Sequence, residues 1–212
     1  MNRFAILFSG RGSNLEAILQ HWSRPEENPD TRLSTPVLAL SNRPDAGGLA
    51  RARAAGLPAK VVDHKAYPDR EAFESAMIEA LDEVQADWIV CAGFMRVLTP
   101  SFLKRYEGRV LNTHPSLLPA FPGIHAPEQA IAAGVRVSGC TVHFVDDGVD
   151  TGPIIAQGVV RVEPSDNGQT LGDRIRAIEH ELYPRAIARV LSGQVHREGR
   201  SVAVKGPPLG RP

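Results

Sequence analysis

Apolar and polar positions alternate along the first half of the chain in a way that predicts strands separated by helices. Five apolar runs have the length and composition of buried strands, and they lie at residues 3–8, 36–40, 59–62, 87–93 and 109–114. Three stretches between them repeat apolar residues with helical spacing, at 14–22, 46–56 and 69–84. Continuous apolar strands need cover on both faces, so the pattern predicts parallel βαβ units in a doubly wound sheet.

The second half has a different rhythm. A short helix is predicted at 126–134, and two longer strands at 137–145 and 152–162 are joined by a tight loop. That loop length predicts an antiparallel pair. A long helix at 170–193 and a small hairpin at 195–204 follow. The predicted fold class is therefore α/β, a doubly wound and mostly parallel Rossmann-like sheet with an antiparallel strand near the C-terminal half. We expect a single domain over residues 1–199, with 200–212 forming a strand and a partly disordered tail.

Composition narrows the kinds of partner. The chain of 212 residues has 24 basic and 24 acidic side chains, and this balance predicts neither a nucleic-acid nor a membrane partner. The first apolar run reads as a core strand, without the features of a signal peptide. The two cysteines, Cys91 and Cys140, lie in separate apolar runs. They are expected to be reduced and buried, which predicts a cytoplasmic protein, and no residue spacing predicts a metal site.

A glycine-containing loop, "SGRGSN" at residues 9–14, follows the first strand and precedes a helix. Gly10 and Gly12 permit a tight turn, and Ser13 or Asn14 is expected to cap the helix. Free backbone N–H groups at a helix start attract an anion. Leu15 stands where the dinucleotide fingerprint needs a third glycine. The loop therefore indicates either a site for a phosphate monoester or only a tight turn before a capped helix.

The fifth strand ends with two polar side chains that are expected to share a face, Asn112 and His114. Ligands bind at the carboxyl ends of strands in open α/β sheets. Asp150 lies in a glycine-flanked loop between the two later strands. An amide, an imidazole and a carboxylate together can stabilise an oxyanion and move a proton. No serine or cysteine nucleophile motif accompanies them, so the attacking group is expected to come from a substrate. His143 and His180 are interpreted as packed or exposed histidines.

Five segments stand out between about residues 3 and 192, and they are "FSGRGSN", "AGFMRVL", "NTHPSLLPAFPG", "HFVDDGVDTGPII" and "IEHELYP". Together they show a resemblance to the phosphoribosylglycinamide formyltransferase family. It implies transfer of a formyl group from 10-formyltetrahydrofolate, the co-substrate, to the amine of 5-phosphoribosylglycinamide in purine biosynthesis, with no metal. It also implies that Asn112 and His114 stabilise the tetrahedral intermediate and that Asp150 assists proton transfer.

The resemblance further implies binding residues. The substrate-binding set is Gly12, Ser13, Asn14, Arg176, Ala177, Ile178 and Glu179. The folate-binding set is Arg70, Met95, Arg96, Val97, Leu98, Asn112, Asp146, Asp147, Gly148, Val149 and Asp150.

Two alternatives remain open. A formyltetrahydrofolate hydrolase shares the same polar triad and uses water as nucleophile, but it carries an added N-terminal domain, for which a strand beginning at residue 3 leaves no room. A non-catalytic phosphosugar-binding module would not need Asn112, His114 and Asp150 together. A tRNA formyltransferase is disfavoured because the chain carries no net basic charge. The sequence does not distinguish a monomer from a homodimer.

Overall fold

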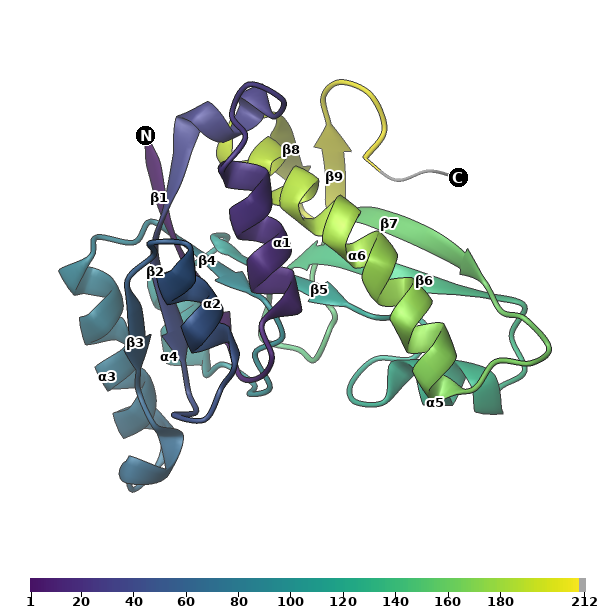
Figure 1. Ribbon diagram of the computed structural model, residues 1–212, viewed down its shortest axis with the longest axis horizontal. Helices are drawn as coiled ribbons and strands as arrows, with labels where there is room; N and C mark the ends of the chain where they lie inside the picture. Colours follow the sequence, from purple (N-terminus) through teal and green to yellow (C-terminus); the bar gives the residue numbers. More distant parts are fainter. Residues whose placement is uncertain (210–212) are drawn as a thin grey trace. The chain divides into compact units, whose positions relative to one another are not determined.

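The computed structural model describes residues 1–209 and contains two sheets (Figure 1). The strands of the larger sheet are hydrogen-bonded in the order β3-β2-β1-β4-β5-β6-β7. Its strands are β1 Asn2–Phe8, β2 Ser34–Ser41, β3 Ala59–Val61, β4 Trp88–Cys91, β5 Val110–His114, β6 Val137–Phe144 and β7 Ile154–Arg161. The smaller sheet pairs β8 Val195–Glu198 with β9 Ser201–Val204. The helices are α1 Ser13–Trp22, η1 Pro29–Leu33, α2 Gly48–Ala54, η2 His64–Ala66, α3 Arg70–Glu83, α4 Pro100–Arg105, α5 Ala126–Ala132 and α6 Gly168–Leu191.

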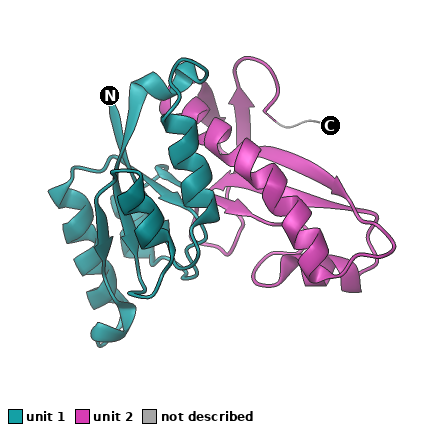
Figure 2. Cartoon of the chain, in the orientation of Figure 1, with its two compact units in different colours: residues 1–111 teal, residues 112–212 magenta. Residues whose placement is uncertain are grey.

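The chain divides into two compact units, residues 1–111 and 112–212 (Figure 2). The division falls inside β5. The predicted single domain over 1–199 is not decided by this division and stays a prediction.

Unit 1 is built on parallel strands. β1 pairs in parallel with β2 on one side and β4 on the other, and β2 pairs in parallel with β3. Phe4, Ile6 and Leu7 of β1 are fully buried, as a central strand with two covered faces requires. The chain order reverses at β1, because β2 and β4 flank it. Such a reversal opens a crevice at the carboxyl ends of the strands, and the loops after β1 and β4 begin there.

Unit 2 contains an antiparallel strand pair covered by a long helix. β6 and β7 are antiparallel, with Thr141 opposite Gln157. α6 lies along this pair (Figure 1), and its buried face includes Leu171, Ile175 and Leu182. The side chain of Asn167 accepts a hydrogen bond from the backbone N–H of Thr170 and so fixes where α6 begins.

The predicted fold class is confirmed, including the antiparallel strand in the C-terminal half. The predicted hairpin at 195–204 is also confirmed, as β8 and β9. The expected capping of α1 by Ser13 or Asn14 was wrong, because the N-cap is Gly12 and no side chain caps the helix. The predicted disordered end of the tail, at 210–212, lies outside the described residues.

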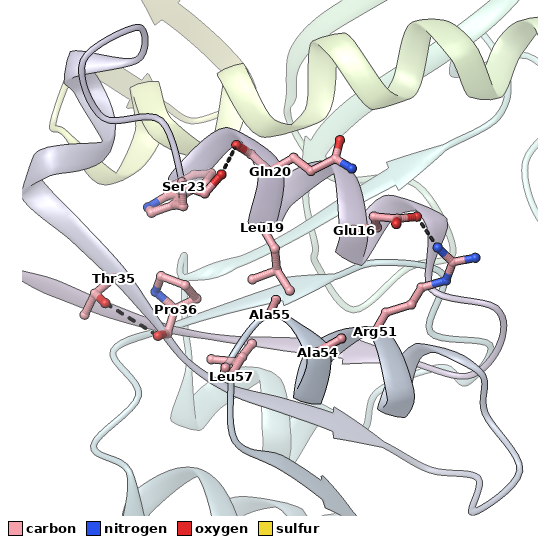
Figure 3. A pocket seen from close by; sticks show the side chains of 12 residues that line it. Glu16, Leu19, Gln20, Ser23, Thr35, Pro36, Arg51, Ala54, Ala55 and Leu57 are labelled. Atoms are coloured by element: carbon pink, nitrogen blue, oxygen red, sulfur yellow. Dashed lines mark hydrogen bonds and ion pairs between the residues drawn. The ribbon is translucent and has the colours of Figure 1, made fainter.

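Two further observations bear on function. Within residues 1–209, no helix combines the length and apolar character needed to cross a membrane. An open groove of about 630 Å³ lies between α1, α2 and the start of β2 (Figure 3). Its lining includes Leu19, Ala55 and Leu57, with an ion pair between Arg51 and Glu16, and none of the predicted site residues. The groove therefore does not coincide with the predicted chemistry.

Candidate active site

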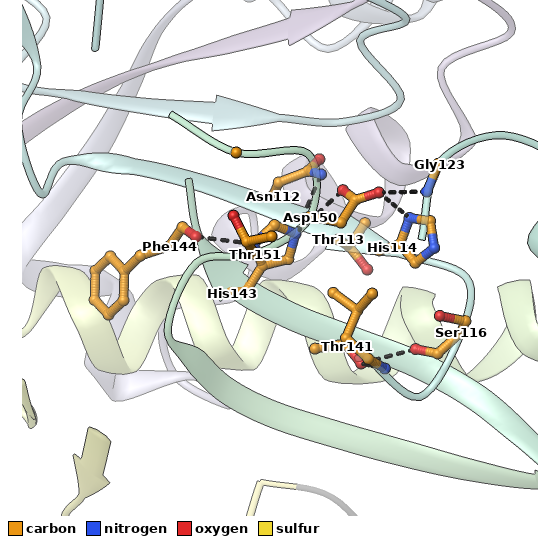
Figure 4. Close-up of polar contacts among 12 residues, drawn as sticks. Asn112, Thr113, His114, Ser116, Gly123, Thr141, His143, Phe144, Asp150 and Thr151 are labelled. Atoms are coloured by element: carbon orange, nitrogen blue, oxygen red, sulfur yellow. Dashed lines mark hydrogen bonds and ion pairs between the residues drawn. The ribbon is translucent and has the colours of Figure 1, made fainter. Parts of the chain in front are cut away.

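The polar side chains predicted to carry the chemistry converge in unit 2, at the end of β5 (Figure 4). His114 is 4% exposed and Asn112 is half-buried. Strand alternation puts these two side chains on one face and Thr113 on the other. The buried backbone of β5 therefore carries an imidazole and an amide to the same point.

Asp150 reaches His114 from the loop between β6 and β7. Its Oδ2 lies 3.2 Å from Nδ1 of His114 and accepts a 2.8 Å hydrogen bond from the backbone N–H of Gly123. Asp150 has a φ of 55°, a left-handed conformation that side chains seldom adopt. At Gly152, an added Cβ would lie 1.7 Å from the carbonyl oxygen of Phe144. Only glycine allows the loop to return this closely to β6, so the loop is shaped to present the Asp150 carboxylate.

Both ring nitrogens of His114 face oxygen acceptors. Nδ1 faces the Asp150 carboxylate, and Nε2 lies 2.8 Å from the carbonyl oxygen of Phe121. A ring nitrogen that carries a proton donates to the oxygen that it faces. The ring of His114 is thereby held between the Asp150 carboxylate and the loop after β5.

His143 lies in the same cluster. The sequence predicted only a packed or exposed histidine at this position, without a part in the site. Its Nδ1–H donates to the carbonyl oxygen of Phe144 at 2.8 Å, and its Nε2 lies 3.4 Å from Nδ2 of Asn112. Burial lowers the pKa of His143, partly offset by that backbone hydrogen bond and by Asp150. A neutral ring with its proton on Nδ1 leaves Nε2 as an acceptor. His143 thereby turns the NH₂ group of Asn112 toward itself and leaves the second amide hydrogen for a ligand.

The backbone of the loop after β5 is held by hydrogen bonds to side chains of β6 and β7. Thr141 Oγ1 donates to the carbonyl of Ser116 at 2.7 Å and accepts from the N–H of Leu118 at 3.0 Å. Gln157, opposite Thr141 in the β6–β7 ladder, donates to the carbonyl of Leu118 at 2.9 Å. These contacts fix the loop that supplies the Phe121 and Gly123 backbone partners described above.

The predicted substrate residues of α6 differ in their surroundings. Glu179 is 7% exposed and accepts a 3.0 Å hydrogen bond from the hydroxyl of Thr113, which strand alternation turns away from His114. Arg176 forms an ion pair with Asp173. Ile178 packs against Gly158 of β7. Ala177 lies in the same turn of α6.

Gly12, Ser13 and Asn14 lie together at the start of α1 in unit 1. Gly12 is left-handed, with a φ of 78°, and an added Cβ would lie 2.6 Å from the Cα of Gly48. No side chain caps α1, so its first backbone N–H groups have no side-chain acceptor. Uncapped N–H groups at the positive end of a helix dipole suit an anion such as phosphate.

The remaining predicted folate residues lie in two loops and one helix start. Met95, Arg96, Val97 and Leu98 follow β4; Met95 is 74% exposed, whereas Leu98 is buried. Arg70 is the first residue of α3. Asp146, Asp147, Gly148 and Val149 precede Asp150, and the hydroxyl of Thr151 donates to Asp146 at 2.6 Å. Residues 1–209 contain no group of three or more His, Cys, Asp or Glu side chains placed to hold a metal ion.

Comparisons with known proteins agree with the predicted resemblance. A family model described as formyl transferase matches residues 2–187. Phosphoribosylglycinamide formyltransferase of Bacillus subtilis (strain 168) is 44% identical over 191 residues, which are 90% of this chain and 95% of the relative. A crystal structure of glycinamide ribonucleotide transformylase 1 from Symbiobacterium toebii superposes with a TM-score of 0.90 at 45% identity, covering 96% of this chain and 94% of that one.

Some relatives are much longer. The trifunctional purine biosynthetic protein adenosine-3 of Drosophila pseudoobscura pseudoobscura is 44% identical over 195 residues, or 92% of this chain. The chain spans 14% of the length of that relative.

Proposed function

The chain belongs to the formyl transferase family, and we propose that it transfers the formyl group of 10-formyltetrahydrofolate to the amine of 5-phosphoribosylglycinamide, a step of purine biosynthesis. The observation that carries this proposal is the cluster of Asn112, His114 and Asp150, in which both nitrogens of His114 face acceptors. The names of relatives that match along nearly their whole length support the choice of substrates.

The chemistry is an acyl transfer without an enzyme nucleophile. The amine nitrogen of the acceptor forms a bond to the formyl carbon, and the formyl oxygen takes up negative charge. The free amide hydrogen of Asn112 donates a hydrogen bond to that oxyanion, and His114 in its protonated form stabilises it by its positive charge. The bond from the formyl carbon to N10 of the folate then breaks, and the amine proton is passed to N10. Asp150 holds the His114 cation and assists this proton transfer, directly or through water.

Binding roles follow from the same proposal. The uncapped start of α1, with Gly12, Ser13 and Asn14, binds the acceptor phosphate. Residues 176–179 of α6 contact the rest of the acceptor, and Glu179 is the acidic residue among them. Arg70 and the segments 95–98 and 146–150 surround the folate. The two substrates are small molecules. Because both cysteines are buried thiols, we assign the protein to the cytoplasm. It acts in this proposal as a monomer or a homodimer.

A direct experiment compares the absorbance of 10-formyltetrahydrofolate mixed with the protein in the presence and absence of 5-phosphoribosylglycinamide. A change that requires the acceptor is the result we expect. A change without acceptor would identify a hydrolase that uses water, and no change in either mixture would identify a binding module. Either of these two results would contradict the proposal.

A further inference from the structure

We infer that Ser9 and Glu74 are positioning residues, which hold residues 93–98 in the conformation that binds the folate. The inference rests on the proposed function, because it takes this loop as part of the folate site. All the residues involved lie in unit 1. Hydrogen bonds hold the loop in its first half and directly after its last residue.

Ser9 anchors the first half of the loop. Its hydroxyl accepts a 2.8 Å hydrogen bond from the backbone N–H of Met95 and donates a 2.7 Å hydrogen bond to Oδ1 of Asn42. Its own backbone N–H donates to the carbonyl of Gly93 at 3.0 Å. Ser9 and Asn42 are 5% and 3% exposed. The loop after β4 is thus tied to the ends of β1 and β2 by groups shielded from water.

Glu74 anchors the other end. This buried carboxylate of α3 accepts a hydrogen bond from the backbone N–H of Thr99, at 3.0 Å to Oε1, and a second from the hydroxyl of Thr99. The same hydroxyl accepts from the N–H of Phe102 and caps α4. Burial raises the pKa of Glu74, whereas the hydrogen bonds from Thr99 act in the opposite sense. The buried carboxylate of Glu74 thus binds Thr99, the residue directly after the loop.

The anchored backbone displays apolar side chains to solvent. Met95 and Val97 are 74% and 52% exposed, although large apolar residues are usually buried. An apolar wall that is already fixed loses little conformational freedom when a flat ring binds to it. The two anchors therefore act on folate affinity, whereas the chemical step depends on residues of the His114 cluster.

The test replaces Ser9 by alanine and uses Ser41→Ala as the matched control. Ser41 is fully buried at the end of the neighbouring strand, but its hydroxyl contacts only the backbone of Arg43. Ser9→Ala leaves the Met95 N–H without its acceptor, and loss of such a bond corresponds to about a tenfold change in an equilibrium constant. We expect the Kd for tetrahydrofolate to rise about tenfold, with kcat at saturation and the acceptor KM near wild type. Ser41→Ala is expected to keep the wild-type Kd.

A second readout follows the loop without any ligand. Amide hydrogen exchange of Met95 is expected to be about tenfold faster in Ser9→Ala than in wild type and unchanged in Ser41→Ala. Glu74→Gln, which keeps one oxygen for the Thr99 N–H, is expected to weaken tetrahydrofolate binding in the same direction while preserving kcat. Equal tetrahydrofolate affinity in Ser9→Ala and Ser41→Ala, or a loss of kcat at unchanged affinity, would overturn the inference. Wild-type protein that does not bind tetrahydrofolate would instead reject the proposed function, and the inference with it.

Discussion

At the scale of single residues, the roles of the two histidines follow from the atoms that they face. His114 faces a carboxylate and a carbonyl, whereas buried His143 gives its one proton to the carbonyl of Phe144. His114 is thereby held in place beside Asp150, and neutral His143 orients the amide of Asn112.

Replacing Asp150 by asparagine tests the role of its negative charge beside His114. The amide oxygen can still accept from Gly123, and the new NH₂ group would face the lone pair on Nε2 of His143, so the shape of the loop is retained. Without the carboxylate, the proton transfer that Asp150 assists loses its acid–base group. We expect kcat at neutral pH to fall about a hundredfold or more. A kcat within about threefold of wild type would show that the charge of Asp150 takes no part in the reaction.

The neutral state of His143 predicts a pH dependence of stability. Because burial lowers its pKa in the folded protein, the unfolded chain binds this proton more readily. The contribution of neutral His143 to stability should therefore be fully present above about pH 6.5. The free energy of unfolding should decrease as the pH falls below that value. We expect a smaller decrease between pH 7 and pH 5 in His143→Gln than in wild type, measured by urea unfolding. The exposed His196→Gln serves as control, and equal slopes in all three proteins would contradict the burial argument.

At the scale of elements, the periodic segments were predictable, whereas the three shortest helices, which are η1, η2 and α4, were missed in the sequence. Apolar runs and helical spacing located the strands of the larger sheet together with α1, α2, α3, α5 and α6. α4 was missed because it has only six residues. Thr99 and Pro100 are a recognisable start signal, but a helix this short also depends on tertiary contacts such as that between Thr99 and Glu74.

The site was predictable from the sequence where its residues lie on one strand. Asn112 and His114 share a strand face, and that is local information. The contacts of His143 and Gly123 depend on how β6 and the loop after β5 return to β5, which period-two alternation does not encode.

The start of α1 is tested better at Ser13 than at Gly12. Any side chain at Gly12 would collide with the backbone of Gly48, so a defect there would report packing whether or not phosphate binds. Ser13→Asp introduces a negative charge at a helix N-terminus, which is favourable for the helix by about 0.3–1 kcal/mol but repels a phosphate. We expect unchanged or higher stability, an acceptor KM raised at least about tenfold, and an unchanged tetrahydrofolate Kd. Ser13→Ala is the neutral control. An equal acceptor KM in Ser13→Asp and Ser13→Ala would contradict phosphate binding at this loop.

At the scale of the whole molecule, each compact unit contains one buried cysteine. Cys91 belongs to unit 1 and Cys140 to unit 2. Burial raises the pKa of both thiols to about 12, so neither forms much thiolate at neutral pH.

The two thiols can test the predicted single domain. If residues 1–199 unfold as one cooperative unit, Cys91 and Cys140 become reactive together. We expect mass spectrometry to find equal rates of alkylation at both sites at pH 7.5, and both rates to rise in parallel with urea. A Cys140→Ser variant is expected to leave the rate at Cys91 unchanged. Alkylation of one thiol many times faster than the other would show that the two units open independently.

In the proposed reaction, the formyl carbon is transferred to an amine and His114 stabilises the intermediate. The most direct measurement follows a ¹³C label on the formyl group of 10-formyltetrahydrofolate by NMR, with 5-phosphoribosylglycinamide present, in wild type and in His114→Ala. We expect the label to appear in the formamide of the acceptor. We also expect the rate in His114→Ala to be roughly a hundred- to a thousandfold lower at saturating substrates. Label released as formate by wild type, or a His114→Ala rate within about threefold of wild type, would contradict the proposed reaction.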